Sequence, residues 1–71
     1  MDKSLNPYKT VGASVASARE LLGLTQTAFG ALPFVNASRA TISRWERGLD
    51  APDIVQAIAI ERMTGKDLRV F

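Results

Sequence analysis

A chain of 71 residues has room for one small domain with a modest core. It contains neither cysteine nor histidine, which excludes disulfides, thiolate metal sites and the side chain most often used as a general base. The net charge of +2 is by itself a weak indication of a nucleic-acid partner. The charges are unevenly distributed, however, because residues 25–48 hold three arginines and one glutamate, whereas residues 49–61 hold three acidic residues and no basic one.

The N-terminal residues lack the apolar core of a signal peptide, and the apolar runs elsewhere are too short for a membrane span. Residues 1–9 are expected to form a flexible arm, and residues 10–71 a single folded domain. Apolar residues at helical spacing predict a first helix over residues 11–22, with Thr10 as its N-cap and Gly23 after its end. The apolar positions are Val11, Val15, Ala18 and Leu22.

A second helix is predicted to begin after Thr25, its N-cap, and to end before Pro33. A glycine inside a helix is unfavourable, so Gly30 suggests that another helix crosses closely there. The sequence then predicts a corner, in which Asn36 tolerates a left-handed backbone.

A third helix is predicted over residues 39–47, with Ser38 as the best N-cap, Asn36 as a competing cap and Gly48 after the C-terminus. Apolar residues from Ile54 to Met63 predict a fourth helix. Pro52 is expected in the first turn of that helix and Gly65 at its end. The last residues fit a short turn or an extended strand, and no other strand pattern is present, so the predicted fold class is all-α.

The predicted third helix combines a narrow apolar stripe with a broad basic and polar arc. Ile42 and Trp45 form the stripe, and their spacing favours a core position for Trp45 over an exposed position that would stack on bases. Guanidinium groups on the arc could donate to guanine edges in the major groove, while hydroxyls and helix N-termini could hold phosphates. A solvated basic face on a small bundle is the alternative interpretation. The arc holds Arg39, Ala40, Ser43, Arg44 and Arg47.

Two segments resemble the helix-turn-helix family of phage Cro and repressor proteins: GLTQ at residues 23–26 and SRATISRWERG at residues 38–48. The resemblance covers about residues 11–68. It implies a compact, lambda-repressor-like bundle of four to five helices that binds double-stranded DNA and regulates transcription. We expect a bacterial protein that is nucleoid-associated when bound to DNA and needs no cofactor, metal or membrane. The absence of cysteine favours the cytoplasm, and the absence of histidine, cysteine and a P-loop pattern argues against an enzyme.

The resemblance assigns roles to individual residues. The base-reading residues would be Arg39, Ala40, Ser43 and Arg44. The residues at the DNA backbone would be Thr25, Gln26, Ser38, Thr41 and Arg47. Gln26 would also brace the third helix, and Arg19 and Glu46 would form a partly buried ion pair. Such a pair has a local reason as well, because a carboxylate beside an apolar stripe needs a cationic partner.

One segment departs from the family pattern. Residues 31–38, ALPFVNAS, are two residues longer than the usual corner. Either the corner bulges or the second helix continues, and Phe34 and Val35 are expected to pack on the core. If the insert tilts the third helix, the base-reading positions shift by one residue.

The favoured function is that of a Cro-like repressor of phage, prophage or mobile-element origin, which inserts residues 39–47 into the major groove of an operator. We expect a homodimer, at least on DNA, that reads a pseudo-palindromic site, and Phe71 is a candidate for its interface. The chain offers no evident small-molecule effector site. The alternative is an antitoxin that binds a toxin and regulates its own promoter, although no long extension is present that could wrap a toxin.

Overall fold

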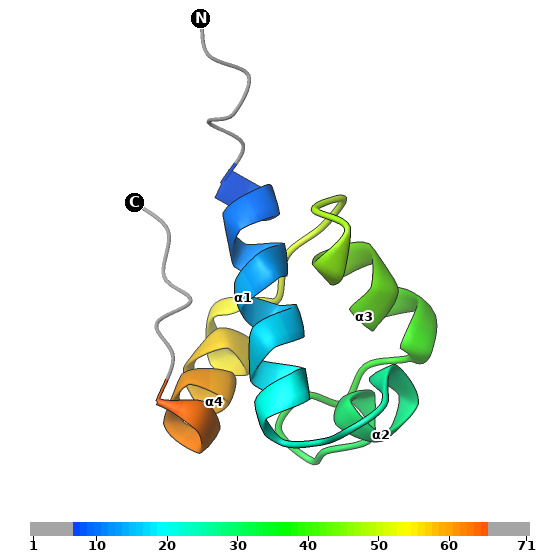
Figure 1. Ribbon diagram of the computed structural model, residues 1–71, viewed down its shortest axis with the longest axis vertical. Coiled ribbons are helices and arrows are strands. Elements are labelled where there is room, and N and C mark those ends of the chain that lie inside the picture. Colours follow the sequence, from blue (N-terminus) through cyan, green and yellow to red (C-terminus); the bar gives the residue numbers. More distant parts are fainter. Residues whose placement is uncertain (1–6, 66–71) are drawn as a thin grey trace, which may run out of the picture.

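The computed structural model describes residues 7–65 of the chain, and side chains from Thr10 onward. Within that range the fold is all-α, as predicted, with no strand. The four helices are α1 (Pro7–Leu21), α2 (Gln26–Gly30), α3 (Arg39–Glu46) and α4 (Ile54–Thr64). Helix α1 lies in the middle, with α3 on one side and α4 on the other, and the short α2 lies near the C-terminal end of α1 (Figure 1). The segment 66–71, including Phe71, lies outside the described residues.

The first helix begins earlier than the sequence predicts. Thr10 is therefore inside α1 and is not its N-cap, and residues 7–9 belong to a helix instead of an arm. Proline suits the first position of a helix because its fixed φ is helical and its missing N–H would have no partner there. The helix therefore begins at Pro7. Residues 1–6 lie outside the described part, and the limits of the domain stay a prediction.

Glycines in the left-handed conformation follow α1 and α3, as predicted. Gly23 has φ 71° and Gly48 has φ 75°. In each case the next amide bonds back to the helix: Leu24 N donates to the carbonyl of Arg19 at 3.2 Å, and Leu49 N donates to the carbonyl of Arg44 at 2.9 Å. These closing turns send the chain back across the helix that it has just left.

A single apolar core joins the four helices. Both residues of the predicted α3 stripe are buried, so the core position of Trp45 is confirmed. Leu22, the last residue of the predicted α1 stripe, packs against this core while partly buried. No helix among residues 7–65 is long and apolar enough to cross a membrane. The buried hydrophobic side chains are Val11, Val15, Ala18, Phe29, Val35, Ile42, Trp45 and Ile60.

The fourth helix begins later than predicted. Asp53 is the N-cap and forms a capping box with Gln56, so Pro52 precedes the helix instead of lying in its first turn. The apolar residues at the start of α4 do not face the core. Ile60 is buried and Ala57 packs beside it, whereas Ile54 and Val55 are exposed.

The corner between α2 and α3 bulges, because α2 ends at Gly30 and does not continue into the extra residues. Val35 is fully buried, as expected, but Phe34 is mostly exposed, which corrects the prediction that both pack on the core. The close approach expected at Gly30 is present, but it is made mainly by the corner and only in part by a crossing helix. A Cβ on Gly30 would collide with the carbonyl oxygen of Ala37, a corner residue. From the crossing helix α3 it would meet the side chain of Ile42.

Candidate nucleic-acid interface

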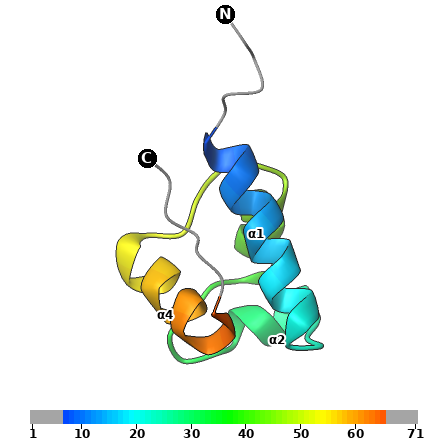
Figure 2. The same ribbon diagram turned by 60° about the vertical axis from the view of Figure 1, so that its left-hand side comes forward.

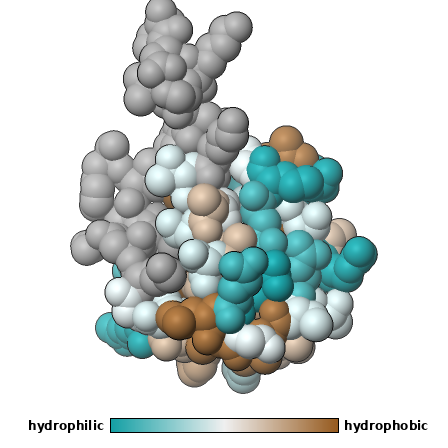
Figure 3. Space-filling view, viewed as in Figure 1, coloured by the Kyte–Doolittle hydropathy of each residue, from teal (hydrophilic) through white to brown (hydrophobic). Residues whose placement is uncertain are grey.

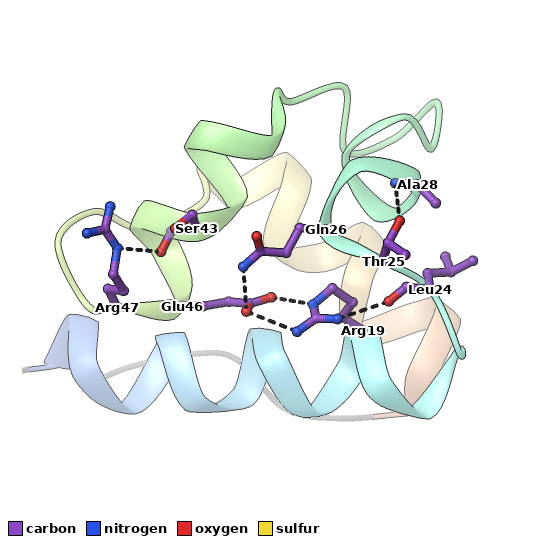
Figure 4. Close-up of polar contacts among 8 residues, drawn as sticks. All are labelled: Arg19, Leu24, Thr25, Gln26, Ala28, Ser43, Glu46 and Arg47. Carbon is purple, nitrogen blue, oxygen red and sulfur yellow. Dashed lines mark hydrogen bonds and ion pairs between the residues drawn. The ribbon is translucent and has the colours of Figure 1, made fainter.

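An ion pair fixes α3 against α1. Arg19 Nε donates to Glu46 Oε2 at 2.6 Å and Arg19 Nη2 donates to Glu46 Oε1 at 3.2 Å. Arg19 Nη1 also donates to the carbonyl of Leu24 at 3.0 Å, and Gln26 Nε2 donates to Glu46 Oε1 at 3.1 Å (Figure 4). One carboxylate therefore links α1, the start of α2 and α3. The expected ion pair between Arg19 and Glu46 is present.

This ion pair is largely removed from water. The side chains of Arg19 and Glu46 are 19% and 11% exposed. The hydrogen bond to Glu46 raises the pKa of the Arg19 guanidinium above its already high usual value, so the cation is permanent. A shielded, bidentate pair of this kind has a fixed geometry, and it holds the helix that carries Glu46 in one orientation.

Close packing of the backbones supports the same junction. A Cβ on Gly12 of α1 would collide with the carbonyl oxygens of Trp45 and Glu46. The buried side chains of Ile42 and Trp45 fill the rest of the contact. The inner face of α3 is therefore fully occupied by packing and by the ion pair, and only its outer face is free for a partner.

The outer face of α3 carries the residues that the sequence marked for reading bases. Arg39, Ala40 and Arg44 are exposed, and Ser43 is half-buried between them and the core. The small side chains of Ala40 and Ser43 leave the helix backbone accessible between the longer arginines. Hydrophilic residues also cover much of the side of the molecule on which α3 lies (Figure 3).

Hydroxyl groups cap both helices of the motif, as predicted. Thr25 Oγ1 accepts a hydrogen bond from Ala28 N at 3.1 Å. Ser38 Oγ accepts one from Thr41 N at 3.2 Å and lies 3.1 Å from the hydroxyl of Thr41. A hydroxyl that accepts at a cap keeps its own O–H as a donor, so Thr25 has one free O–H, and Ser38 and Thr41 together have one more.

Two further residues complete the predicted set. Arg47 is the exposed C-cap of α3, and its Nε donates to the carbonyl of Ser43 at 3.4 Å, a long contact that leaves most of the guanidinium free. Gln26 is half-buried with one amide N–H directed to Glu46, so its other N–H remains for a second acceptor. Its bracing role is thus visible in the structure, whereas a contact with a phosphate is an expectation.

The sequence reasoning missed one neighbour of the base-reading residues. Asp50 Oδ2 lies 3.9 Å from Arg44 Nε, with the two side chains 56% and 51% exposed. The turn at Gly48 brings Asp50 back beside Arg44. The available signal was the left-handed turn predicted at Gly48, because the chain after such a turn bonds back to the last turn of the helix.

A short helix, a corner and a second helix whose inner face is fixed and whose outer face is basic define a helix-turn-helix domain. The chain belongs to the helix-turn-helix family, whose model matches residues 15–71. The search of curated proteins and the search of solved structures gave no match. The family is one of DNA-binding regulators, so we describe this protein as a DNA-binding regulator of transcription.

Proposed function

We propose that this protein binds a specific double-stranded DNA sequence by placing the outer face of α3 in the major groove. The observation that carries the proposal is the contrast between the two faces of α3. Its inner face is fixed by Ile42, Trp45 and the Arg19–Glu46 pair, and its outer face presents exposed arginines. A rigid mounting matters for sequence reading because a hydrogen bond to a base edge requires a fixed donor position.

In this proposal the base-reading residues are Arg39, Ala40, Ser43 and Arg44. Each arginine can donate two hydrogen bonds to the O6 and N7 atoms of a guanine, and Ala40 admits the helix close to the base edges. Ser43 can donate to or accept from any of several bases, so it would contribute less discrimination than the arginines.

The phosphate contacts are assigned to the five residues that surround this face. The free O–H groups of Thr25 and of the Ser38–Thr41 pair, the second N–H of Gln26 and the guanidinium of Arg47 are all donors. Donors of this kind set the position of a protein on the duplex without reading its sequence. They would fix the depth and the angle at which α3 enters the groove.

Asp50 affects the binding of Arg44 to DNA through its negative charge. Its carboxylate would lie close to the DNA phosphates, and Arg44 must leave it to reach a base. The pair is exposed and 3.9 Å long, so opening it costs little. We therefore propose that Asp50 holds Arg44 in place in the free protein and lowers the affinity for DNA without specifying the sequence.

For the biological role we propose a Cro-like repressor of phage, prophage or mobile-element origin. It would act as a homodimer on a pseudo-palindromic operator, with half-sites about one helical turn, roughly 34 Å, apart. Occupation of such an operator would block the polymerase. The fold, the outer face of α3 and the family membership support DNA binding, and the repressor role extends that conclusion.

The test is selection of bound duplexes from a random pool, followed by affinity measurements on the enriched site at several salt concentrations. Arg44→Ala should cost about 1–3 kcal/mol and relax the preference at one base pair. Arg47→Ala should instead weaken binding to all sequences and lower the salt slope by about one unit. Asp50→Asn should raise the affinity for all sequences.

Arg62→Ala is the matched control, because Arg62 is also exposed but lies on α4. It should leave the affinity for a duplex with a single half-site unchanged. If no sequence is enriched at low salt, or if Arg62→Ala weakens this binding as much as Arg44→Ala, the proposed interface is wrong.

A further inference from the structure

The outer side of α4 is apolar and exposed to solvent. Ile54 and Val55 are 72% and 69% exposed, and Ile58, one turn further along the helix, is exposed as well. The opposite side of α4 packs on the core through Ile60. An eleven-residue helix thus has apolar residues on both sides, and only one side is covered within the described part of the chain.

The bulged corner extends this apolar surface. Phe34 is exposed beside α4, where the corner passes close to the helix (Figure 2). Together they form an open groove of about 410 Å³, lined by Phe34, Val55, Ile58, Ala59, Arg62 and Met63. A hydrogen bond from Gln56 Nε2 to the carbonyl of Val35, at 2.7 Å, holds the corner in this position. We call the surface made by Phe34, Ile54, Val55 and Ile58 the α4 surface.

We propose that the α4 surface binds the same surface of a second copy of this chain, with the two α4 helices antiparallel across a two-fold axis near Ile58. A two-fold interface brings identical patches together, so the patch must be complementary to itself. Ile54, Ile58 and Arg62 are spaced four residues apart and lie along one line of the helix. In the antiparallel arrangement Ile58 faces its own copy, and Ile54 faces Arg62.

The charges at the two ends of this line match the antiparallel arrangement. Asp53 caps the N-terminus of α4, and Arg62 lies in its last turn. Both are exposed, and neither forms an ion pair within residues 7–65. In an antiparallel pair the stem of Arg62 would cover Ile54 of the second copy, and its guanidinium would reach the carboxylate of Asp53. A parallel pair would instead place the two Arg62 side chains together.

The chemistry of the surface favours a protein over a nucleic acid as the occupant. The α4 surface is apolar, and Arg62 is the one basic residue of its groove, whereas a nucleic-acid site needs several cations along the phosphates. This inference rests on the proposed function, in which two copies of the protein bind two half-sites. It adds the surface through which the two copies join. Dimerisation itself can be tested without DNA.

The experiment is sedimentation equilibrium of the full chain without DNA, at protein concentrations up to about 1 mM. An association with a dissociation constant above this value would be very weak. We expect a monomer–dimer equilibrium whose dissociation constant rises at least tenfold in Ile58→Asp and in Arg62→Glu. Leu21→Asp is the matched control, because Leu21 is an apolar residue on α1 that is more exposed than Ile58, and it should leave the equilibrium unchanged. Circular dichroism would verify that each variant is folded.

Crosslinking tests the position of the axis. Because the chain has no cysteine, Ile58→Cys introduces a single thiol, which should form a symmetric disulfide under mild oxidation. Leu21→Cys should not. A monomer at every concentration, or a dimer that Ile58→Asp leaves intact, would overturn the proposal.

Binding to a duplex with one half-site separates this inference from the proposed function. If the α4 surface is not a dimer interface but α3 reads DNA, single-site binding persists while the sedimentation and crosslinking results are negative. If α3 does not read DNA, single-site binding is absent whatever the oligomeric state.

Discussion

Two junctions hold α3 in place, and they consist of different kinds of contact. The junction with α1 uses regular helices, a close backbone contact at Gly12 and the shielded Arg19–Glu46 pair. The junction at the corner, residues 31–38, uses irregular backbone that is held by the buried Val35 and by Gln56 of α4. The first junction sets the orientation of the helix, and the second sets where its N-terminus lies. Substitutions can weaken each junction separately.

The largest loss of stability is expected from a substitution at the junction with α1. Glu46→Ala would leave Arg19 and Gln26 without their shared acceptor in a site that is mostly shielded from water. We expect a loss of about 3 kcal/mol in the free energy of unfolding, because a shielded charge that loses its partner keeps its desolvation cost. Urea unfolding followed by the fluorescence of Trp45, the single tryptophan, would measure it.

Asp50→Ala is the control for this prediction, since it removes the acidic partner from the exposed pair with Arg44. Its cost should be below about 0.5 kcal/mol. Equal losses in the two variants would mean that the Arg19–Glu46 pair is not what orients α3.

Gly30→Ala tests the junction at the corner. The new methyl group would press on the carbonyl of Ala37, which accommodates it only by moving backbone. We expect a net loss of about 2 kcal/mol, because overpacking exceeds the gain in helix propensity. Thr27→Ala, at an exposed position of the same helix, should change the stability by less than about 0.5 kcal/mol. A neutral Gly30→Ala would show that the corner is loosely attached.

The difference between the junctions also explains what could be predicted from the sequence. Helical spacing made the packing of Val15, Ala18 and Trp45 predictable. The ion pair of Glu46 with Arg19 was predicted from the family resemblance, and the need of a shielded carboxylate for a cation gives it a physical reason. The left-handed turns at Gly23 and Gly48 were predictable for a similar local reason.

The corner could not be predicted in the same way. Whether Phe34 or Val35 faces inward depends on where α4 lies, and that position is set by contacts distant in the sequence. Which side of α4 is covered could not be predicted either, because a helix with apolar residues on two sides does not show which of them faces the core. Asp50 was missed because the turn at Gly48 shows that the chain returns toward α3 but does not show which side chain then lies beside Arg44.

A smaller effect is expected from Gln56→Glu, which isolates the hydrogen bond between α4 and the corner. Glutamate can still accept from Asp53 N, as Gln56 Oε1 does at 2.9 Å, but it cannot donate to the carbonyl of Val35. We expect a loss of about 1.5 kcal/mol in the free energy of unfolding, because the carbonyl of the buried Val35 loses its donor.

Hydrogen exchange would localise that loss. The amide of Ala37, which donates to the carbonyl of Gly30 at 2.8 Å, should exchange faster, while the amide of Ile42 in α3 keeps its protection. A uniform increase at both amides would indicate a global effect and would contradict a separate corner junction.

The smallest effect is expected at Asn36, the one non-glycine residue of the described chain with positive φ, at 47°. Asparagine adopts this backbone conformation more easily than most residues, so Asn36→Ala should cost about 1 kcal/mol. Asn36→Gly should be within about 0.5 kcal/mol of the natural chain, because the relief of strain is offset by greater freedom when unfolded. Thermal unfolding of both variants would check the order. If alanine is tolerated as well as glycine, the left-handed turn is not required, and the position of the α3 N-terminus must depend on Val35 and Gln56 alone.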